Sequence, residues 1–303
     1  MRCLFLLGAH RSGTSWLHQL IASSPQVAFL SYRDIRQQLY PGPEPLRDDQ
    51  LERDLRSSGT TRGFDGVDIG VDLPEEYGFV LEKPVFGFYA NRPVSNTNFE
   101  PLRSLITRKC QQAPERLFLV LKNPVDFYDG ALRLAEAFPD SAWVCLHRHP
   151  WAVFRSQMQA WRQLADQPNA YLASLDAGYA RLMADPLQRT ALRFLLRQRQ
   201  GMEMVLLTLA DACAFHLAHH EVFEATGVRL RYEDLCRDPA QQLQALGERL
   251  GLPGLPAPPA RLGAKSRDVP DDPLMRDVFE AHADRFAPYC AWLGYAHTTG
   301  SSA

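Results

Sequence analysis

The first residues whose types and spacing could perform chemistry form the glycine-bounded loop Gly8–Trp16, with the sequence GAHRSGTSW. This loop follows a short apolar run and precedes a helical pattern. Glycines allow such a loop to curl until successive backbone N–H groups point inward, and the following helix adds partial positive charge at its N-terminus. Arg11 adds a full positive charge, and hydroxyl side chains stand close to it in sequence: Ser12, Thr14 and Ser15. The pattern predicts a site for phosphate or sulfate groups.

The frame Gly-x4-Gly is shared with the P-loop of nucleoside triphosphatases, but Thr14 stands where that motif has its lysine. The core RSGTSW resembles instead the 5′-phosphosulfate loop of sulfotransferases that use 3′-phosphoadenylyl sulfate (PAPS). His10 replaces the proline that is usual at this place in the family. The resemblance implies that the 5′-phosphosulfate is bound by Arg11, Ser12, Gly13, Thr14, Ser15 and Trp16.

A second anion site is predicted at Arg148 and Ser156. Arg148 follows an apolar run, and Ser156 comes eight residues later, in the next predicted helix, whose first turn suits Pro150. This spacing resembles the family element Arg-x-Pro-x5-Ser. The resemblance implies that Arg148 and Ser156 bind the 3′-phosphate of PAPS.

Two later segments also resemble family elements. The run RYEDL at 231–235 resembles a signature that we expect to be mainly structural, with Tyr232 as a neighbour of the adenine. The short basic loop GAKSR at 263–267 resembles the loop that family members place over the 3′-phosphate. The residues that this resemblance assigns to donor binding are Lys265, Ser266 and Arg267.

Sulfuryl transfer needs a cation to neutralise charge that develops on the leaving phosphate. Lys122 ends an apolar strand pattern in the run LVLKNP, at the sheet edge where the sites of α/β proteins gather. With Arg11, it is the predicted catalytic cation. No His/Cys/Asp cluster in the sequence has metal-ligand spacing, so we expect no metal cofactor.

The reaction also needs a base to accept the proton of the acceptor hydroxyl, and three acids remain open for this role. The segment LPEEYGF at 73–79 resembles an acidic segment in one bacterial branch of the family, which favours Glu76, with Glu75 beside it. Asp126 lies shortly after Lys122, where many relatives carry a histidine. It is the alternative, as the base or as an orienting group.

These groups need a scaffold that brings the ends of several strands together. Short, nearly all-apolar runs alternate with helical patterns, which is typical of a parallel sheet covered on both faces. The expected fold class is therefore α/β, a P-loop-like three-layer sandwich. The predicted strands are Cys3–Leu7, Val27–Leu30, Arg116–Leu121, Trp143–Leu146 and Val228–Arg231. The predicted helices are Thr14–Ala22, Asp129–Ala137, Trp151–Leu164, Leu192–Leu209 and Pro239–Leu250.

We expect a single sulfotransferase domain over residues 1–296, followed by a flexible tail at 297–303. Within the domain, residues at about 40–110 are rich in Pro, Gly, Asp and Arg and predict an irregular insertion. Residues at about 165–225 predict a helical elaboration. Both regions fall between predicted strands, which favours one domain over two.

Composition excludes several classes of protein. A formal net charge of −2 over 303 residues argues against a nucleic-acid partner. The apolar start is too short for a signal peptide, and we read no run of the ~18–20 apolar residues that a membrane span requires. The six cysteines form no CxxC pair, which is typical of free thiols in a reducing compartment. We expect a cytoplasmic protein without a membrane partner; its oligomeric state is open.

The expected function is transfer of a sulfuryl group from PAPS to a hydroxyl of a small-molecule acceptor, such as a phenol, with adenosine 3′,5′-bisphosphate as the product. Two alternatives are a P-loop-type kinase or NTPase and a non-catalytic nucleotide-binding protein. The chain lacks the lysine and the aspartate that hold phosphate and Mg²⁺ in P-loop kinases and NTPases, which argues against the first alternative. The second is disfavoured because Arg11, Lys122, Arg148 and Ser156 occur together.

Overall fold

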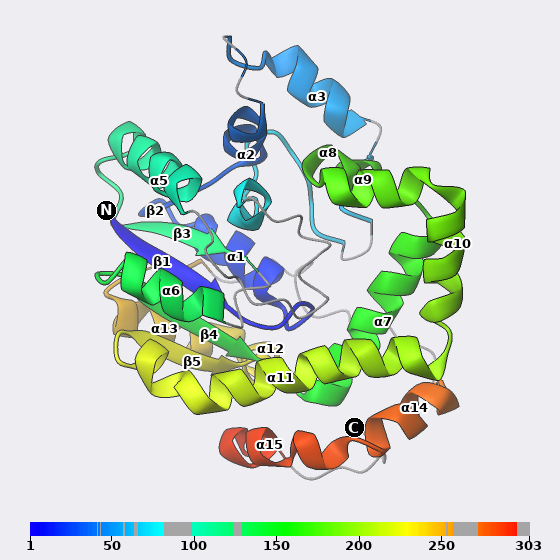
Figure 1. Cartoon of the computed structure of the whole chain (residues 1–303). Coiled ribbons are helices and arrows are strands. Elements are labelled where there is room, and N and C mark those ends of the chain that lie inside the picture. The colour runs from blue at the N-terminus through cyan, green and yellow to red at the C-terminus, as the bar shows by residue number, and fades with distance from the viewer. Residues whose placement is uncertain are drawn as a thin grey trace.

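The centre of the protein is a five-stranded parallel sheet with the strand order β2-β3-β1-β4-β5 (Figure 1). The computed structural model describes residues 1–40, 42, 44–56, 58–63, 66–81, 99–123, 129–252, 254–256 and 272–295. The strands are β1 (Arg2–Leu7), β2 (Val27–Phe29), β3 (Phe118–Lys122), β4 (Ala142–His147) and β5 (Gly227–Arg231). From β1 the chain builds the sheet in both directions, with β3 and β2 on one side and β4 and β5 on the other. Ligands of open α/β sheets bind at the carboxyl ends of the strands where the strand order changes direction in this way.

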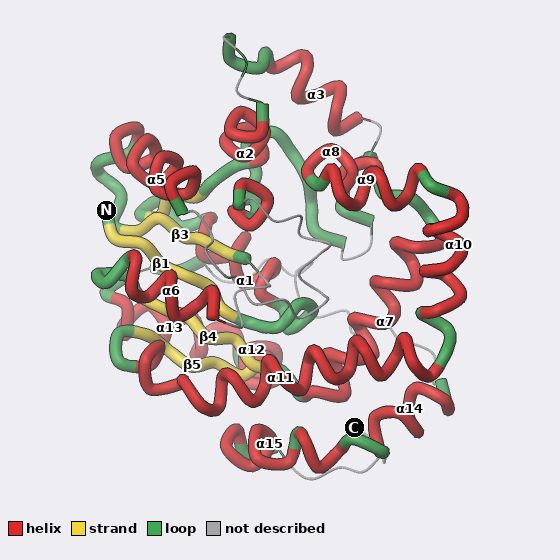
Figure 2. Tube along the Cα trace, viewed as in Figure 1, coloured by secondary structure: helices red, strands yellow, loops and turns green. Residues whose placement is uncertain are grey.

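Helices cover both faces of this sheet (Figure 2). On β1, Leu4 and Leu6 face one core, whereas Phe5 and Leu7 face the other, because successive side chains of a strand alternate. The first face is covered by α1 (Thr14–Ala22) and α13 (Pro239–Leu250). The second face is covered by α5 (Glu100–Gln112), α6 (Asp129–Ala137) and α11 (Arg199–Glu224). The predicted three-layer α/β class is confirmed, and the five predicted strands differ from the observed ones by small shifts at their ends.

The predicted helix Leu192–Leu209 is wrong as a single element. Helix α10 (Pro186–Leu195) ends before this segment is half complete, and α11 begins at Arg199. A Cβ atom on Gly201 would lie 2.0 Å from the carbonyl oxygen of Leu195, so the chain turns a corner that a larger residue would block. Leu196 is buried at this corner, so the apolar pattern of the sequence continues through it. The sequence therefore does not indicate that one helix ends here and another begins.

Helix α11 is long and apolar enough to cross a membrane by its length and composition, contrary to the expectation that no stretch would be. Half of its most apolar window is buried inside the protein, where α11 packs against β4 and β5. A core helix of a globular protein has the same properties. The other helices around it are α7 (Pro150–Asp166), α14 (Pro273–Glu280), η2 (Ala283–Arg285) and α15 (Ala287–Leu293). Two short helices, α8 (Ala170–Leu175) and α9 (Ala177–Ala184), connect α7 to α10.

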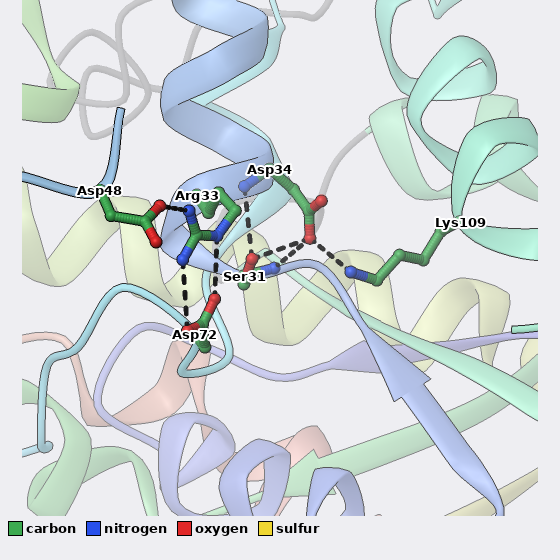
Figure 3. A network of polar contacts seen from close by, with 6 residues as sticks. All are labelled: Ser31, Arg33, Asp34, Asp48, Asp72 and Lys109. Carbon is green, nitrogen blue, oxygen red and sulfur yellow. Dashed lines mark hydrogen bonds and ion pairs between the residues drawn. The ribbon is translucent and has the colours of Figure 1, made fainter. Parts of the chain in front are cut away.

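The region expected to be irregular contains regular elements that the sequence analysis missed. These are α3 (Asp48–Arg56), η1 (Tyr77–Val80) and α5, and a further helix, α2 (Tyr32–Leu39), precedes them. Ser31 and Asp34 form a capping box at the start of α2. Asp34 also accepts a hydrogen bond from Lys109 of α5 at 2.7 Å (Figure 3).

Arg33 of α2 forms ion pairs with two acids from other segments. Its guanidinium lies between Asp48, the first residue of α3, and Asp72, in the loop before η1, and it pairs with both (Figure 3). Ion pairs at exposed positions contribute little energy each. These contacts nevertheless connect the start of α3 and the loop before η1 to α2.

Candidate active site

The loop between β1 and α1 lies at the carboxyl edge of the sheet and has the backbone conformation of an anion site. Arg11 has a φ of 74° and Gly13 a φ of 101°, both in the left-handed region. This region is uncommon for a residue other than glycine, and it turns neighbouring N–H groups toward a common centre. Helix α1 begins directly afterwards, at Thr14, and adds partial positive charge at the same place.

Close packing explains both glycines of the loop. A Cβ atom on Gly8 would lie 2.4 Å from Cγ2 of Thr14, and one on Gly13 would lie 2.5 Å from the ring of Tyr232. The hydroxyl of Ser12 is buried and has no hydrogen-bond partner among the described residues. Buried polar groups are normally hydrogen-bonded, so this hydroxyl fits a loop that binds a polar ligand.

The structure brings the loop together with the two residues predicted to bind the 3′-phosphate. Nε of Arg11 donates a hydrogen bond to Oγ of Ser156 on α7 at 3.1 Å. Arg148, directly after β4, donates to the carbonyl oxygen of Arg11 at 3.0 Å. Gln157, the neighbour of Ser156, donates to the carbonyl oxygen of His10 at 2.8 Å. The start of α7 and the first loop therefore form one continuous, basic surface.

The RYEDL segment supports this surface. The guanidinium of Arg148 stacks over the ring of Tyr232, 4.5 Å from its centroid. Glu233 accepts a hydrogen bond from the backbone N–H of His149 at 2.9 Å and another from the hydroxyl of Tyr295 at 2.7 Å. Glu233 thus links the end of β4 to the C-terminal part of the described chain, and Tyr232 lies beside both the loop and Arg148.

Lys122 reaches the same place from the end of β3, the strand next to β1. Its Nζ donates to Oγ of Ser15 at 2.9 Å and lies 2.5 Å from Oε1 of Glu76. The lysine side chain is only 2% exposed, so the ion pair with Glu76 compensates the loss of water around the ammonium group. The predicted cation and the favoured predicted base therefore form a direct, buried pair.

Arg62 completes this cluster, and it was not predicted from the sequence. Its guanidinium donates to Oε1 of Glu76 and to Oε1 of Glu75, each at 2.8 Å, and its side chain is 7% exposed. Burial alone would raise the pKa of Glu76, but the charges of Lys122 and Arg62 lower it to about 2. Burial raises the pKa of Glu75 to about 7 despite the attraction of Arg62, and the charge of Glu76 adds to the rise. The pKa of Glu75 thus lies well above that of its neighbour Glu76.

Four of the predicted site residues lie outside the described residues: Asp126, Lys265, Ser266 and Arg267. Trp16 packs against the core on the α1 side of the sheet, and its Nε1 has no hydrogen-bond partner in the described part of the chain. Arg62 and Gln157 are the residues that the sequence analysis missed. Gln157 follows Ser156 directly and could have been considered with it, whereas Arg62 stands in a loop without periodicity and carries no local signal.

Comparison with known proteins identifies relatives of this chain. The sequence profile described as "Sulfotransferase family" matches residues 3–256. Two curated relatives are named omega-hydroxy-beta-dihydromenaquinone-9 sulfotransferase Stf3, from Mycobacterium bovis and Mycobacterium tuberculosis. Each is 24% identical over 210 residues, which cover 63% of this chain and 48% of the relative. The chain thus spans about half the length of the curated relatives it matches.

Solved structures share the fold. A sulfotransferase from Alicyclobacillus acidocaldarius has a TM-score of 0.51 and 15% identity, and the match covers 98% of this chain and 97% of the other. Sulfotransferase STF9 from Mycobacterium avium has a TM-score of 0.54 and 19% identity, with 97% of this chain and 77% of the other covered. Because the family profile covers most of the chain, including the loop, Lys122, Arg148 and the RYEDL segment, this chain belongs to the sulfotransferase family.

Proposed function

We propose that this protein transfers a sulfuryl group from PAPS to a hydroxyl of a small-molecule acceptor. One observation carries the proposal: the described structure gathers Arg11, Arg148 and Ser156 around one loop, with the Lys122–Glu76 pair beside it. The first three residues offer charge and hydrogen bonds to a donor with two separate anionic ends. The pair offers a cation and a carboxylate for the chemistry itself. Membership of the sulfotransferase family supports this assignment.

The proposed donor roles come from the family resemblance, and the positions of the side chains support them. The loop residues Arg11–Trp16 would hold the 5′-phosphosulfate through backbone N–H groups, hydroxyls and the helix N-terminus. Arg148 and Ser156 would hold the 3′-phosphate, and the ring of Tyr232 would lie against the adenine. Nε of Arg11 donates a hydrogen bond to Oγ of Ser156 at 3.1 Å. A bound phosphate would give both groups a stronger, charge-assisted partner. Lys265, Ser266 and Arg267 remain proposed contacts to the same phosphate.

The chemical step forms one bond and breaks another. The acceptor oxygen attacks sulfur, the bond between sulfur and the 5′-phosphate oxygen breaks, and adenosine 3′,5′-bisphosphate leaves with the electron pair of that bond. Lys122 would neutralise the charge on the leaving oxygen, with the loop N–H groups. Glu76 would accept the proton of the acceptor hydroxyl. Asp126 remains the alternative base.

The Lys122–Glu76 pair would connect the basicity of Glu76 to donor binding. A carboxylate whose pKa is lowered to about 2 accepts a proton poorly, and Lys122 is the largest cause of this lowering among the charged groups around it. When Lys122 engages the leaving phosphate, its interaction with Glu76 weakens and the pKa of Glu76 rises. Donor binding would therefore activate the base.

The acceptor is proposed by analogy. The curated relatives are named for a hydroxylated menaquinone, which is an apolar molecule with a hydroxyl group. We propose an acceptor of the same chemical kind, an alcohol or phenol on an apolar small molecule. We also propose that the protein acts in the cytoplasm, as one domain over residues 1–296.

Radiolabelled sulfuryl transfer tests the proposed function. The protein is incubated with ³⁵S-labelled PAPS and either p-nitrophenol or 1-decanol, in the presence of EDTA. We expect labelled organic sulfate and an equal amount of adenosine 3′,5′-bisphosphate. EDTA should not matter, because no group of three or more His, Cys, Asp or Glu side chains in the described ranges is placed to hold a metal. Mg²⁺-dependent ATP hydrolysis instead of sulfuryl transfer would support the P-loop NTPase alternative.

A further inference from the structure

Arg62 is a buried arginine that faces two acids at once. Its NH1 group donates to Glu76 and its NH2 group donates to Glu75, so each arm of the guanidinium holds one carboxylate. Glu75 also accepts a hydrogen bond from the backbone N–H of Glu76 at 2.8 Å. A planar guanidinium with fixed donors imposes direction as well as charge, which an ammonium group does not. Arg62 therefore fixes both the position and the orientation of Glu76.

Arg62 is itself held by two different parts of the chain. Its N–H donates to the carbonyl oxygen of Val67 at 2.8 Å. Its carbonyl oxygen accepts a hydrogen bond from Nδ2 of Asn169 at 2.7 Å. Asn169 also caps α8, because its Oδ1 accepts from the N–H of Leu172. The insertion and the helices after α7 thus meet at this arginine.

In the proposed reaction, Lys122 moves away from Glu76 and Arg62 stays in contact with it. Lys122 lies between Ser15 of the first loop and Glu76, so it can reach toward the donor. Arg62 belongs to the same insertion as Glu75 and Glu76 and contacts both of them. If Lys122 moves to the leaving phosphate, Arg62 is the cation among the described residues that still contacts Oε1 of Glu76. A buried carboxylate without a cation would be protonated or displaced.

We propose that Arg62 is a positioning residue for sulfuryl transfer, which keeps Glu76 ionised and aimed while Lys122 stabilises the leaving phosphate. This inference rests on the proposed function. It also gives a role to the insertion and to α8, which carry little resemblance to the family motifs. Both would serve to hold one guanidinium behind the base.

A pH profile separates this role from a merely structural one. Among the described residues, the charged and titratable groups around Glu76 are Lys122 on β3, Arg62 and Glu75 beside it, His10 in the first loop and His18 on α1. An opposite charge at this range lowers the pKa of a carboxyl by ~1–3 units, so removal of Arg62 should raise the pKa of Glu76 by about that amount. Activity requires ionised Glu76, so the acid limb of the kcat profile should move to higher pH. A general loss of packing would lower kcat at every pH without moving the limb.

The test compares Arg62→Met, Arg62→Lys and a matched control, Arg36→Met. Arg36 is also buried in this region, but its ion pair is with Asp54 and it donates a hydrogen bond to the carbonyl oxygen of Ser174. With p-nitrophenol and PAPS, we expect Arg62→Met to lower kcat by about 10–100-fold, because Glu76 loses the guanidinium that orients it, even though loss of a cation alone would make the carboxylate a stronger base. The acid limb should shift upward, with little change in KM for PAPS. Arg62→Lys should lie between the wild type and Arg62→Met, and Arg36→Met should leave the limb in place.

A second measurement does not depend on catalysis. In protein carrying ¹³C-labelled glutamate, the carboxyl signal of Glu76 is identified by its loss in Glu76→Gln and then followed against pH. Glu76 should titrate at higher pH in Arg62→Met, or in Arg62→Lys if the first variant does not fold. If the wild type transfers no sulfate but this shift is seen, the proposed function fails while the role of Arg62 in setting Glu76 stands. An unchanged titration, or an acid limb that stays in place in an active enzyme, overturns the inference.

Discussion

Nζ of Lys122 lies 2.5 Å from Oε1 of Glu76, and both groups are buried. A cation and a carboxylate this close neutralise each other, so neither acts at full strength while they are paired. The proposed reaction needs the lysine at the leaving phosphate and the carboxylate at the acceptor hydroxyl. Under this proposal, donor binding and activation of the base are coupled.

The substitution Glu76→Gln tests the base. It keeps the size of the side chain but removes the proton acceptor, so kcat should fall by ~10²–10⁴-fold, the usual contribution of a positioned base. Affinity for adenosine 3′,5′-bisphosphate should stay near wild type, which calorimetric titration can check. A variant that keeps more than about a third of the wild-type kcat would remove Glu76 from this role, given that expected range. Asp126→Asn would then be the next variant to measure.

The substitution Arg148→Ala tests the donor site. Loss of a charge-assisted hydrogen bond to the 3′-phosphate should weaken binding of adenosine 3′,5′-bisphosphate by ~1.5–3 kcal/mol. Binding of 5′-AMP, which lacks the 3′-phosphate, should change much less. Arg155→Ala is the control, since Arg155 lies on α7, the helix that begins shortly after Arg148, and packs over Trp151. Equal losses for both nucleotides would show that Arg148 acts by supporting the loop and not by contacting the 3′-phosphate.

The substitution Gly13→Ala tests the geometry of the loop. At a φ of 101°, an added Cβ would lie 2.5 Å from the ring of Tyr232, so backbone strain and a steric clash act together. We expect binding of adenosine 3′,5′-bisphosphate to weaken by about tenfold or more, because overpacking of this size costs ~1–3 kcal/mol and displaces the loop. Gly251→Ala is the matched control, with a φ of 66° and open space around the new Cβ. Thermal unfolding should show a loss of ~1 kcal/mol for it, with donor affinity unchanged. Equal donor affinity in both variants would contradict the assignment of this loop.

The raised pKa of Glu75 makes stability depend on pH in a predictable direction. An exposed Glu titrates near 4.3 in the unfolded chain, and Glu75 titrates at about 7 in the folded protein. Its contribution to stability is therefore complete below about pH 4.3 and is lost as the pH rises through 7. Glu75→Gln stays neutral, so its melting temperature should rise relative to wild type by about 2–5 °C from pH 5 to pH 8. A difference that is constant over this range would be inconsistent with a raised pKa.

The central part of the fold and much of the candidate donor site could be predicted from the sequence because their signals are local. Short apolar runs mark buried parallel strands, and the loop motif and the Arg148–Ser156 spacing each lie within one stretch of chain. Lys122 is visible for the same reason, as the polar residue that ends an apolar strand. The confirmed strands therefore place Arg11, Lys122 and Arg148 at one edge of the sheet.

The missed features depend on contacts between distant segments. The break before α11 is hidden because Leu196 is buried within it and continues the apolar pattern. The place of Arg62 depends on Asn169, far along the chain, and on two acids in another loop. Helix α2 had a readable signal, the capping box of Ser31 and Asp34, which the analysis passed over.

Binding of PAPS by this protein can be tested by thermal unfolding with adenosine 3′,5′-bisphosphate, compared with ATP–Mg²⁺. A ligand that binds the folded state at about 100 times its Kd stabilises it by ~2.7 kcal/mol, which is easily measured. We predict this stabilisation with the bisphosphate, its loss in Arg148→Ala, and little effect of ATP–Mg²⁺. No stabilisation by the bisphosphate, with a clear effect of ATP–Mg²⁺, would contradict the account.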